Sequence, residues 1–94
     1  TDEFTEVFET AVRMFPDDTI ANLNAANAAM RRGDLTGAKR YLAKAGDSSE
    51  AVYARGALAI RQKDYDSARR YLNEAKSLGL EQAGITLEQL KEKY

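Results

Sequence analysis

Residues 33–42 read GDLTGAKRYL, and residues 63–72 read KDYDSARRYL. The two stretches lie thirty residues apart, and they share an aspartate, an alanine and the run Arg-Tyr-Leu at matching positions. Ala45 and Ala75 continue the match beyond them. Self-similarity at a fixed period of this size is the sequence signature of a repeat architecture. The chain is therefore predicted to hold at least two copies of one structural unit.

A weaker copy lies upstream, because Phe8 and Ala11 precede Leu42 and Ala45 by thirty-four residues. The spacing between copies is thus thirty-four residues and then thirty. The four missing residues fall in the connection 46–49, and a surface connection is where a deletion costs least.

Each unit is predicted to be two helices joined by a tight turn. Alanine, leucine, arginine, lysine and glutamate dominate, and these residues favour helix. Gly33 suits the left-handed position that ends a helix, and Asp34 is a typical N-cap for the next one; Lys63 and Asp64 take the same parts in the second copy. No stretch alternates as a strand does. The predicted class is all-α, a right-handed α-solenoid of antiparallel helix hairpins with about six helices.

The chain is predicted to form one domain over residues 1–94. Its parts are a half repeat at 1–16, one repeat at 17–48, a second repeat at 49–79 and a closing helix at 80–94. Inside the closing helix, Gly84 weakens helix formation, and Thr86 with Gln89 fits a capping box that would restart the helix. The sequence leaves open whether this last helix is continuous.

Composition excludes several classes of function. The 14 basic and 15 acidic residues nearly balance, whereas nucleic-acid binding needs clustered, uncompensated positive charge. The chain has no cysteine and no histidine, which rules out thiolate, disulfide and imidazole chemistry. The acidic residues are scattered, and no phosphate loop, calcium loop or nucleophile motif is present. We therefore predict no enzyme activity, no catalytic residue, no metal site and no cofactor. We also predict no direct membrane insertion, because no apolar run approaches the ~20 residues that span a bilayer.

The repeat resembles the tetratricopeptide repeat family. That family shows a small residue in its first helix, a Gly-Asp-aromatic turn, an alanine three residues on, a large apolar residue four later, and another alanine three after that. The residues that fit this pattern are Gly33, Asp34, Leu35, Ala38, Leu42 and Ala45, and then Gly56, Asp64, Tyr65, Ala68, Leu72 and Ala75. The chain also departs from the pattern: Asn22 and Val52 stand where a tryptophan is usual, and Ala29 and Ala59 where a tyrosine is usual.

The resemblance implies a concave surface lined by the first helix of each repeat, where a peptide would bind. On this register the predicted partner-binding residues are Leu23, Asn27, Met30 and Arg31 from one repeat, and Tyr53, Ala57, Ile60 and Arg61 from the next. Apolar side chains would supply contact area, and Asn27 would hold a peptide backbone. The alternative is that a terminal helix fills the groove, so that these residues are ordinary core. A carboxylate clamp built on Asn24 and Asn27 is rejected, because Leu23 stands where the family would place a lysine.

The predicted function is a non-catalytic protein or peptide interaction module within a larger protein. The alternative is a structural spacer or capping domain that binds nothing separate. Weak self-association is also expected if the apolar faces of the end helices, at Phe4 and Phe8 and at Leu87 and Leu90, are left uncovered, since the ends of repeat arrays need polar caps.

Residues 20–75 also resemble repeat modules of Bacteroidetes cell-envelope proteins that carry an OmpA-like domain. The stretches behind this resemblance are NLNAAN, GDL, AKRYL and EAVYARG. It implies a periplasmic or outer-membrane-associated setting; without it, a cytoplasmic setting is the expectation, and the sequence leaves the compartment undecided.

Overall fold

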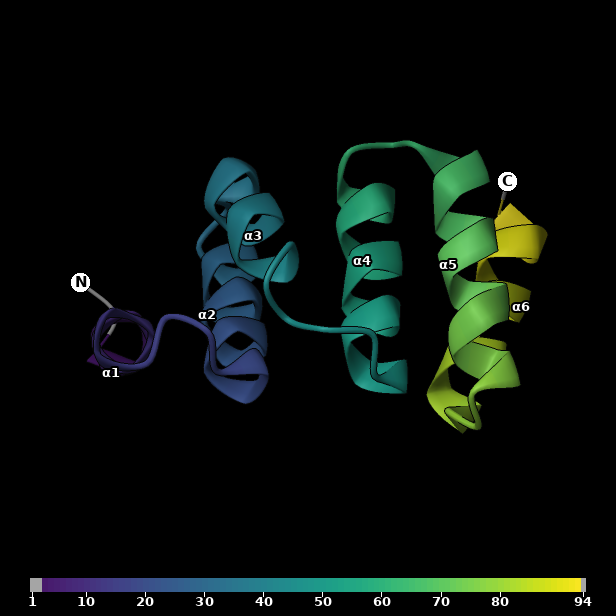
Figure 1. Ribbon diagram of the computed structural model, residues 1–94. Helices are drawn as coiled ribbons and strands as arrows, with labels where there is room; N and C mark the ends of the chain where they lie inside the picture. Colours follow the sequence, from purple (N-terminus) through teal and green to yellow (C-terminus); the bar gives the residue numbers. More distant parts are fainter. Residues whose placement is uncertain (1–2, 94) are drawn as a thin grey trace. The chain divides into compact units, whose positions relative to one another are not determined.

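The computed structural model describes residues 3–93, with side chains from residue 6 onward. This range contains six α-helices and no strand (Figure 1). The helices are α1 (Glu3–Met14), α2 (Thr19–Arg31), α3 (Leu35–Leu42), α4 (Ser49–Arg61), α5 (Tyr65–Ser77) and α6 (Glu81–Lys93). The predicted all-α class of helix hairpins is confirmed. The chain divides into two compact units, unit 1 (Thr1–Gly46) and unit 2 (Asp47–Tyr94), and the single domain over 1–94 stays a prediction.

Unit 1 is built around α2, which packs against both α1 and α3. Most side chains on the buried faces are small: Ala26, Ala29 and Ala38 are fully enclosed, and Met30 and Leu42 are the large apolar residues among them. Small side chains let helix backbones approach closely, so α2 can be covered by its two neighbours at once. The alanine-rich composition of α2 is therefore a packing requirement.

Unit 2 is built around α5, which packs against both α4 and α6. Its core cluster takes residues from all three helices: Val52, Ala59, Ala68, Leu72, Ala75, Ala83, Leu87 and Leu90. Leu72 is fully buried at the centre of α5. A Cβ atom on Gly56 would lie 3.1 Å from Leu72 Cδ2, so the glycine lets α4 sit close against α5.

The turn of unit 1 is a Schellman motif. The Asp34 N–H donates to the Ala29 carbonyl over 2.8 Å, and the Gly33 N–H donates to the Met30 carbonyl over 3.1 Å. Gly33 has φ +83°, the left-handed conformation that this motif requires and that glycine adopts without a Cβ clash. The Asp34 carboxylate then accepts from the Gly37 N–H over 2.9 Å and caps α3.

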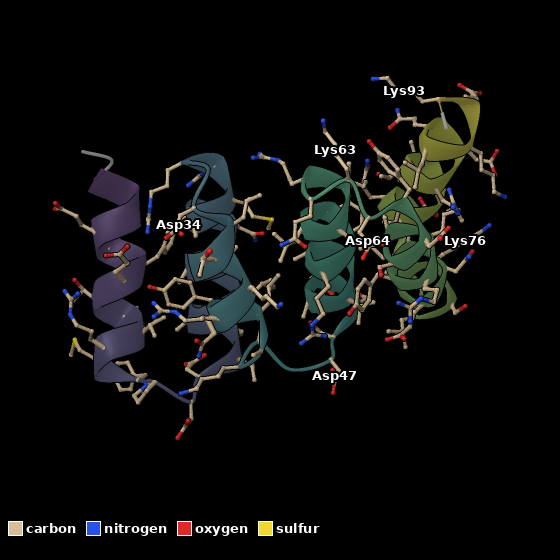
Figure 2. All side chains as sticks on the ribbon, turned by 90° about the horizontal axis from the view of Figure 1, so that it is seen from above. Asp34, Asp47, Lys63, Asp64, Lys76 and Lys93 are labelled. Carbon is tan, nitrogen blue, oxygen red and sulfur yellow. The ribbon has the colours of Figure 1, made fainter. Side chains whose placement is uncertain are left out.

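The same bonds recur thirty residues later in unit 2. The Asp64 N–H donates to the Ala59 carbonyl and the Lys63 N–H to the Ile60 carbonyl, both over 2.9 Å, and the Asp64 carboxylate caps α5 by accepting from the Ser67 N–H. Figure 2 labels Lys63 and Asp64 at this turn and Asp34 at its counterpart. The structural equivalence predicted from the repeated sequence is confirmed for these turns, and the buried alanines Ala38 and Ala68 follow them in register.

Lys63 is the residue that departs from this scheme, because it holds φ +62° without being a glycine. A left-handed residue with a Cβ atom costs roughly 1–2 kcal/mol. We expect Lys63→Gly to raise the free energy of unfolding by about 1 kcal/mol, measured by urea denaturation. Lys63→Ala is the control, because alanine keeps the Cβ atom and should give no gain. An equal gain from both substitutions would mean that the side chain, and not the backbone conformation, limits stability.

Side chains cap the starts of four helices. Asp18 caps α2, Asp34 caps α3, Ser48 caps α4 and Asp64 caps α5. The pKa of Asp34 is held below its ordinary value, chiefly by the hydrogen bond from the Gly37 backbone N–H. The pKa of Asp64 is lowered first by the hydrogen bond with the Ser67 side chain and then by the Ser67 backbone N–H. In contrast α6 follows Leu80, whose side chain has no oxygen to accept such bonds.

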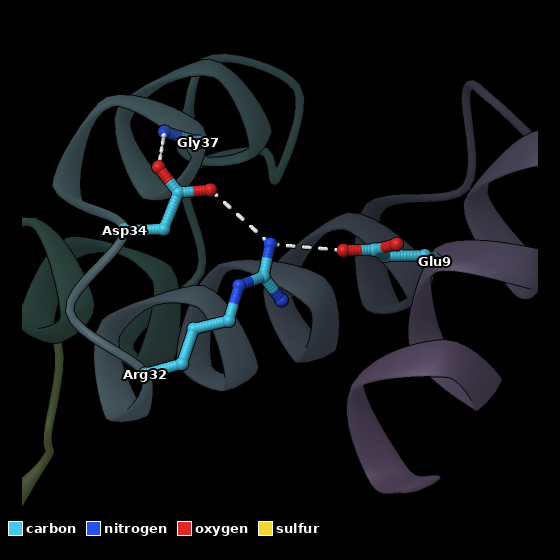
Figure 3. Close-up of polar contacts among 4 residues, drawn as sticks. All are labelled: Glu9, Arg32, Asp34 and Gly37. Carbon is cyan, nitrogen blue, oxygen red and sulfur yellow. Dashed lines mark hydrogen bonds and ion pairs between the residues drawn. The ribbon is translucent and has the colours of Figure 1, made fainter. Parts of the chain in front are cut away.

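Arg32 fastens α1 to the turn of unit 1. Its Nη2 atom lies 2.9 Å from Glu9 Oε1 and 3.1 Å from Asp34 Oδ2, so one guanidinium nitrogen bridges two carboxylates (Figure 3). The side chains of Arg32 and Glu9 are about one-third exposed. Pairs of this exposure contribute little each, so the bridge orients α1 more than it stabilises the unit.

Candidate functional site

In unit 1 the predicted binding residues form one strip along α2. Leu23, Asn27 and Arg31 follow one another at intervals of four residues, which places them on one side of a helix. Leu23 is half-buried, and Asn27 and Arg31 are exposed. Met30 differs from them, because only 7% of it is exposed; it belongs to the core and offers no side-chain surface to a partner. The strip available in unit 1 is therefore polar at two of its three positions.

In unit 2 the corresponding strip lies on α4 and is more covered. Tyr53, Ala57 and Ile60 are half-buried, and Arg61 is exposed. Tyr53 and Ile60 pack against the core cluster that also contains Leu87 and Leu90 of α6. Two of the four predicted residues thus take part in the packing of unit 2.

A hydrogen bond ties this strip to the last helix. The Tyr53 hydroxyl lies 2.9 Å from Thr86 Oγ1 in a partly buried position. Thr86 sits inside α6, which runs unbroken from Glu81 to Lys93, so the capping-box restart at Thr86 and Gln89 is wrong. The Thr86 hydroxyl is free to bond to Tyr53 of another helix, because the backbone N–H groups that it would cap are already paired within α6. Sequence reasoning missed Thr86 as a site residue, since its partner is thirty-three positions away.

Asn22 is a structural residue of unit 1. It is 1% exposed, and its Nδ2 atom donates to the carbonyls of Pro16 over 3.0 Å and of Asp18 over 2.8 Å. These bonds anchor the α1–α2 connection to the start of α2. Its Oδ1 atom has no partner among the described residues. In contrast, Asn24 on the same helix is exposed.

The described side chains also form surface clefts away from the predicted strips. In unit 1 a cleft of about 440 Å³ opens between α1, α2 and α3; its lining includes Val12, Asn22, Tyr41 and Lys44. In unit 2 a cleft of about 510 Å³ lies beside the α5–α6 junction. None of the eight predicted binding residues lines either cleft, so the clefts and the strips are separate features.

Residues 3–93 add little that points to chemistry. Among the side chains that the structure describes, residues 6–93, no group of three or more carboxylates is placed to hold a metal ion. No helix in the same range combines the length and the apolar character that crossing a membrane takes. Leu87 and Leu90, whose exposure was the condition for self-association through the last helix, are buried. Phe8 is half-buried, and the Phe4 side chain falls outside the described residues.

Comparison with known proteins gives one result for the first half of the chain. Residues 6–46 match the model of a family described as "Tetratricopeptide repeat", and no curated protein matches the chain. The matched segment covers the last nine of the twelve residues of α1 and all of α2 and α3, and it ends at Gly46, where unit 1 ends. The capped Schellman turn of unit 1, its small-residue helix packing and this match together support the tetratricopeptide repeat family.

Proposed function

We propose that the chain is a non-catalytic module that binds a protein or peptide, as part of a larger protein. Tetratricopeptide repeats generally mediate interactions between proteins. The observation that carries the proposal is the α2 strip of unit 1. Most of the buried residues of α2 are alanines, whereas Leu23, Asn27 and Arg31 stay at least partly open to solvent, on the same side of the helix as the exposed Ile20 and Asn24. Because a buried face serves packing, an open strip of mixed polar and apolar character is the part of α2 left for recognition.

The chemistry of this strip fits an extended peptide. The Asn27 amide both donates and accepts, so it can pair with a peptide backbone unit. Arg31 offers a planar cation that pairs with a carboxylate. Leu23 supplies apolar contact beside them. In unit 2, Tyr53, Ala57, Ile60 and Arg61 hold the same repeat positions, with less of Tyr53 and Ile60 open to a ligand.

A selection experiment tests the proposal without knowledge of the natural partner. A displayed peptide library would be selected against the full chain, and the enriched peptide titrated by fluorescence polarisation. We expect Arg31→Glu to weaken binding at least tenfold, equivalent to about 1.4 kcal/mol, because the substitution turns the cation that would pair with a carboxylate into a repelling charge. Lys39→Glu is the matched control, since Lys39 is also exposed, lies on α3 and undergoes the same charge reversal.

Both substitutions change exposed side chains and should leave the free energy of unfolding within about 0.5 kcal/mol of the wild type. Equal affinity of the enriched peptide for both variants would place its binding elsewhere and refute the α2 strip as the site. The absence of any enriched peptide would count against the interaction module as a whole.

The second candidate function is a structural spacer or capping domain of a cell-envelope protein with no separate ligand. The Tyr53–Thr86 hydrogen bond favours a structural role for unit 2, because α6 already contacts the strip that a ligand would use. The envelope setting, periplasmic or outer-membrane-associated, stays a prediction from the resemblance of residues 20–75. It would be tested by locating the full-length protein in fractionated cells, where recovery in the cytosolic fraction would reject it.

A further inference from the structure

Within unit 2, helix α6 packs against α4 and α5 as a ligand helix would. It buries one stripe, Ala83, Leu87 and Leu90, at intervals of four and three residues, which is the spacing by which an amphipathic helix enters an apolar groove. The opposite side of α6 is open, with Ile85 more than half exposed.

The surface beneath α6 belongs to α4 and α5. It consists of buried apolar residues of both helices, with Tyr53 and Ile60 packed at its border. One polar group at this border is the Tyr53 hydroxyl, which lies within hydrogen-bond distance of Thr86 of α6. The groove therefore fits a helix with two properties: an apolar stripe of one small and two large residues, as in Ala83, Leu87 and Leu90, and one hydroxyl beside that stripe, as in Thr86.

The helix α6 is held mainly by this contact. Unlike α2, α3, α4 and α5, it has no capping side chain at its start, where Leu80 stands. Gly84 and Thr86 lie within it, and both lower intrinsic helix stability. A helix with weak local preference forms because packing compensates, and elements of this kind open before the rest of a fold.

We propose that the α4–α5 surface of unit 2 is a helix-binding groove, that α6 is its resident occupant, and that its partner is an amphipathic helix with the same stripe and hydroxyl. This inference rests on the proposed function, because it assumes that unit 2 binds a partner, and it adds what kind of partner that is. A helix tethered through Gly79 and Leu80 competes at an effective concentration on the order of millimolar. An external helix therefore binds appreciably only when α6 is displaced or outcompeted.

The test uses a fluorescein-labelled peptide of residues 80–93 as the probe and the full chain as the receptor. Glu88→Pro breaks α6 in its interior without touching the buried stripe, because Glu88 is exposed. We expect the probe to bind Glu88→Pro at least tenfold more tightly than it binds the wild type. The control is Glu88→Ala, which removes the same carboxylate but keeps the helix and should bind like the wild type. A probe carrying Leu87→Asp should lose binding to Glu88→Pro.

Equal probe affinity for Glu88→Pro and Glu88→Ala, with both chains folded by circular dichroism, would overturn the proposal. If Glu88→Pro unfolds the whole of unit 2, amide hydrogen exchange of the wild type decides. The proposal requires α6 amides to exchange through an opening that leaves α4 and α5 protected, and exchange of all three helices at one common rate of global opening rejects it. Failure here leaves the α2 strip of unit 1 untouched, because the library-selected peptide is a separate probe.

Discussion

Leu72→Ala is expected to lower the free energy of unfolding by about 3 to 5 kcal/mol, the cost of deleting a leucine side chain from a well-packed core. Leu72 is fully buried, and it belongs to a cluster that takes side chains from α4, α5 and α6. Few of its neighbours can move into the space, since many are alanines already close to the backbone. A domain of this length is stable by only about 5 to 14 kcal/mol, so the loss is a large share of the total.

Urea denaturation followed by circular dichroism would measure this loss. Leu78→Ala is the control on the same chain segment, because Leu78 is 53% exposed, and it should change stability by less than about 0.5 kcal/mol. Leu42→Ala probes the equivalent repeat position in unit 1, where 2% of the residue is exposed. A cost below 1 kcal/mol for Leu72→Ala would show that unit 2 lacks the rigid core described above.

Asn22→Asp is expected to cost about 3 to 5 kcal/mol at neutral pH, the range found when a buried charge is left without a partner. The two side chains have nearly the same shape, so the effect is electrostatic. The change removes both donors to the Pro16 and Asp18 carbonyls and places a carboxylate against those oxygens. Asn24→Asp is the control, since the same change in charge then occurs at an exposed position of α2.

The cost of Asn22→Asp should depend on pH. Burial and the facing carbonyl oxygens raise the pKa of the new carboxyl in the folded state above its unfolded value near 3.9. Below that unfolded value both states are protonated, and the neutral acid can still donate one hydrogen bond. As the pH rises toward the folded pKa, the unfolded state ionises first and stability is lost. A deficit relative to wild type that stays constant between pH 3 and pH 7 would contradict this account.

The turns are the part of the fold that sequence reasoning predicts best. Gly33 followed by Asp34 is a local signal, since all of the hydrogen bonds of the turn lie within a few residues, and the thirty-residue repeat extends the prediction to Lys63 and Asp64. Both copies, at Gly33 and at Lys63, accordingly form the same Schellman motif. The alanines that follow each turn by four residues are buried for the same reason, because the turn fixes the rotation of the helix after it.

The contacts that sequence reasoning missed join segments far apart in the chain. Nothing near Tyr53 or Thr86 indicates that their hydroxyl groups meet, because that meeting depends on how α6 settles on α4 and α5. The burial of Met30 has a similar cause. It lies three residues after Asn27 and four after the fully buried Ala26, at the margin of the strip. Helical spacing alone does not determine whether a flexible side chain at the edge of the strip packs into the core or faces solvent.

The predominance of alanine among the buried residues has a consequence for how the chain can vary. An enclosed alanine such as Ala38 or Ala68 can lose only one methyl group, but any larger residue must force two helix backbones apart. Leu72 has the opposite sensitivity, because it tolerates no loss of volume. Inherited substitutions in the interior are thus limited in side-chain volume: the alanines cannot become larger, and the few leucines cannot become smaller. The solvent-facing strips are therefore the places where two descendants of this sequence can come to recognise different partners.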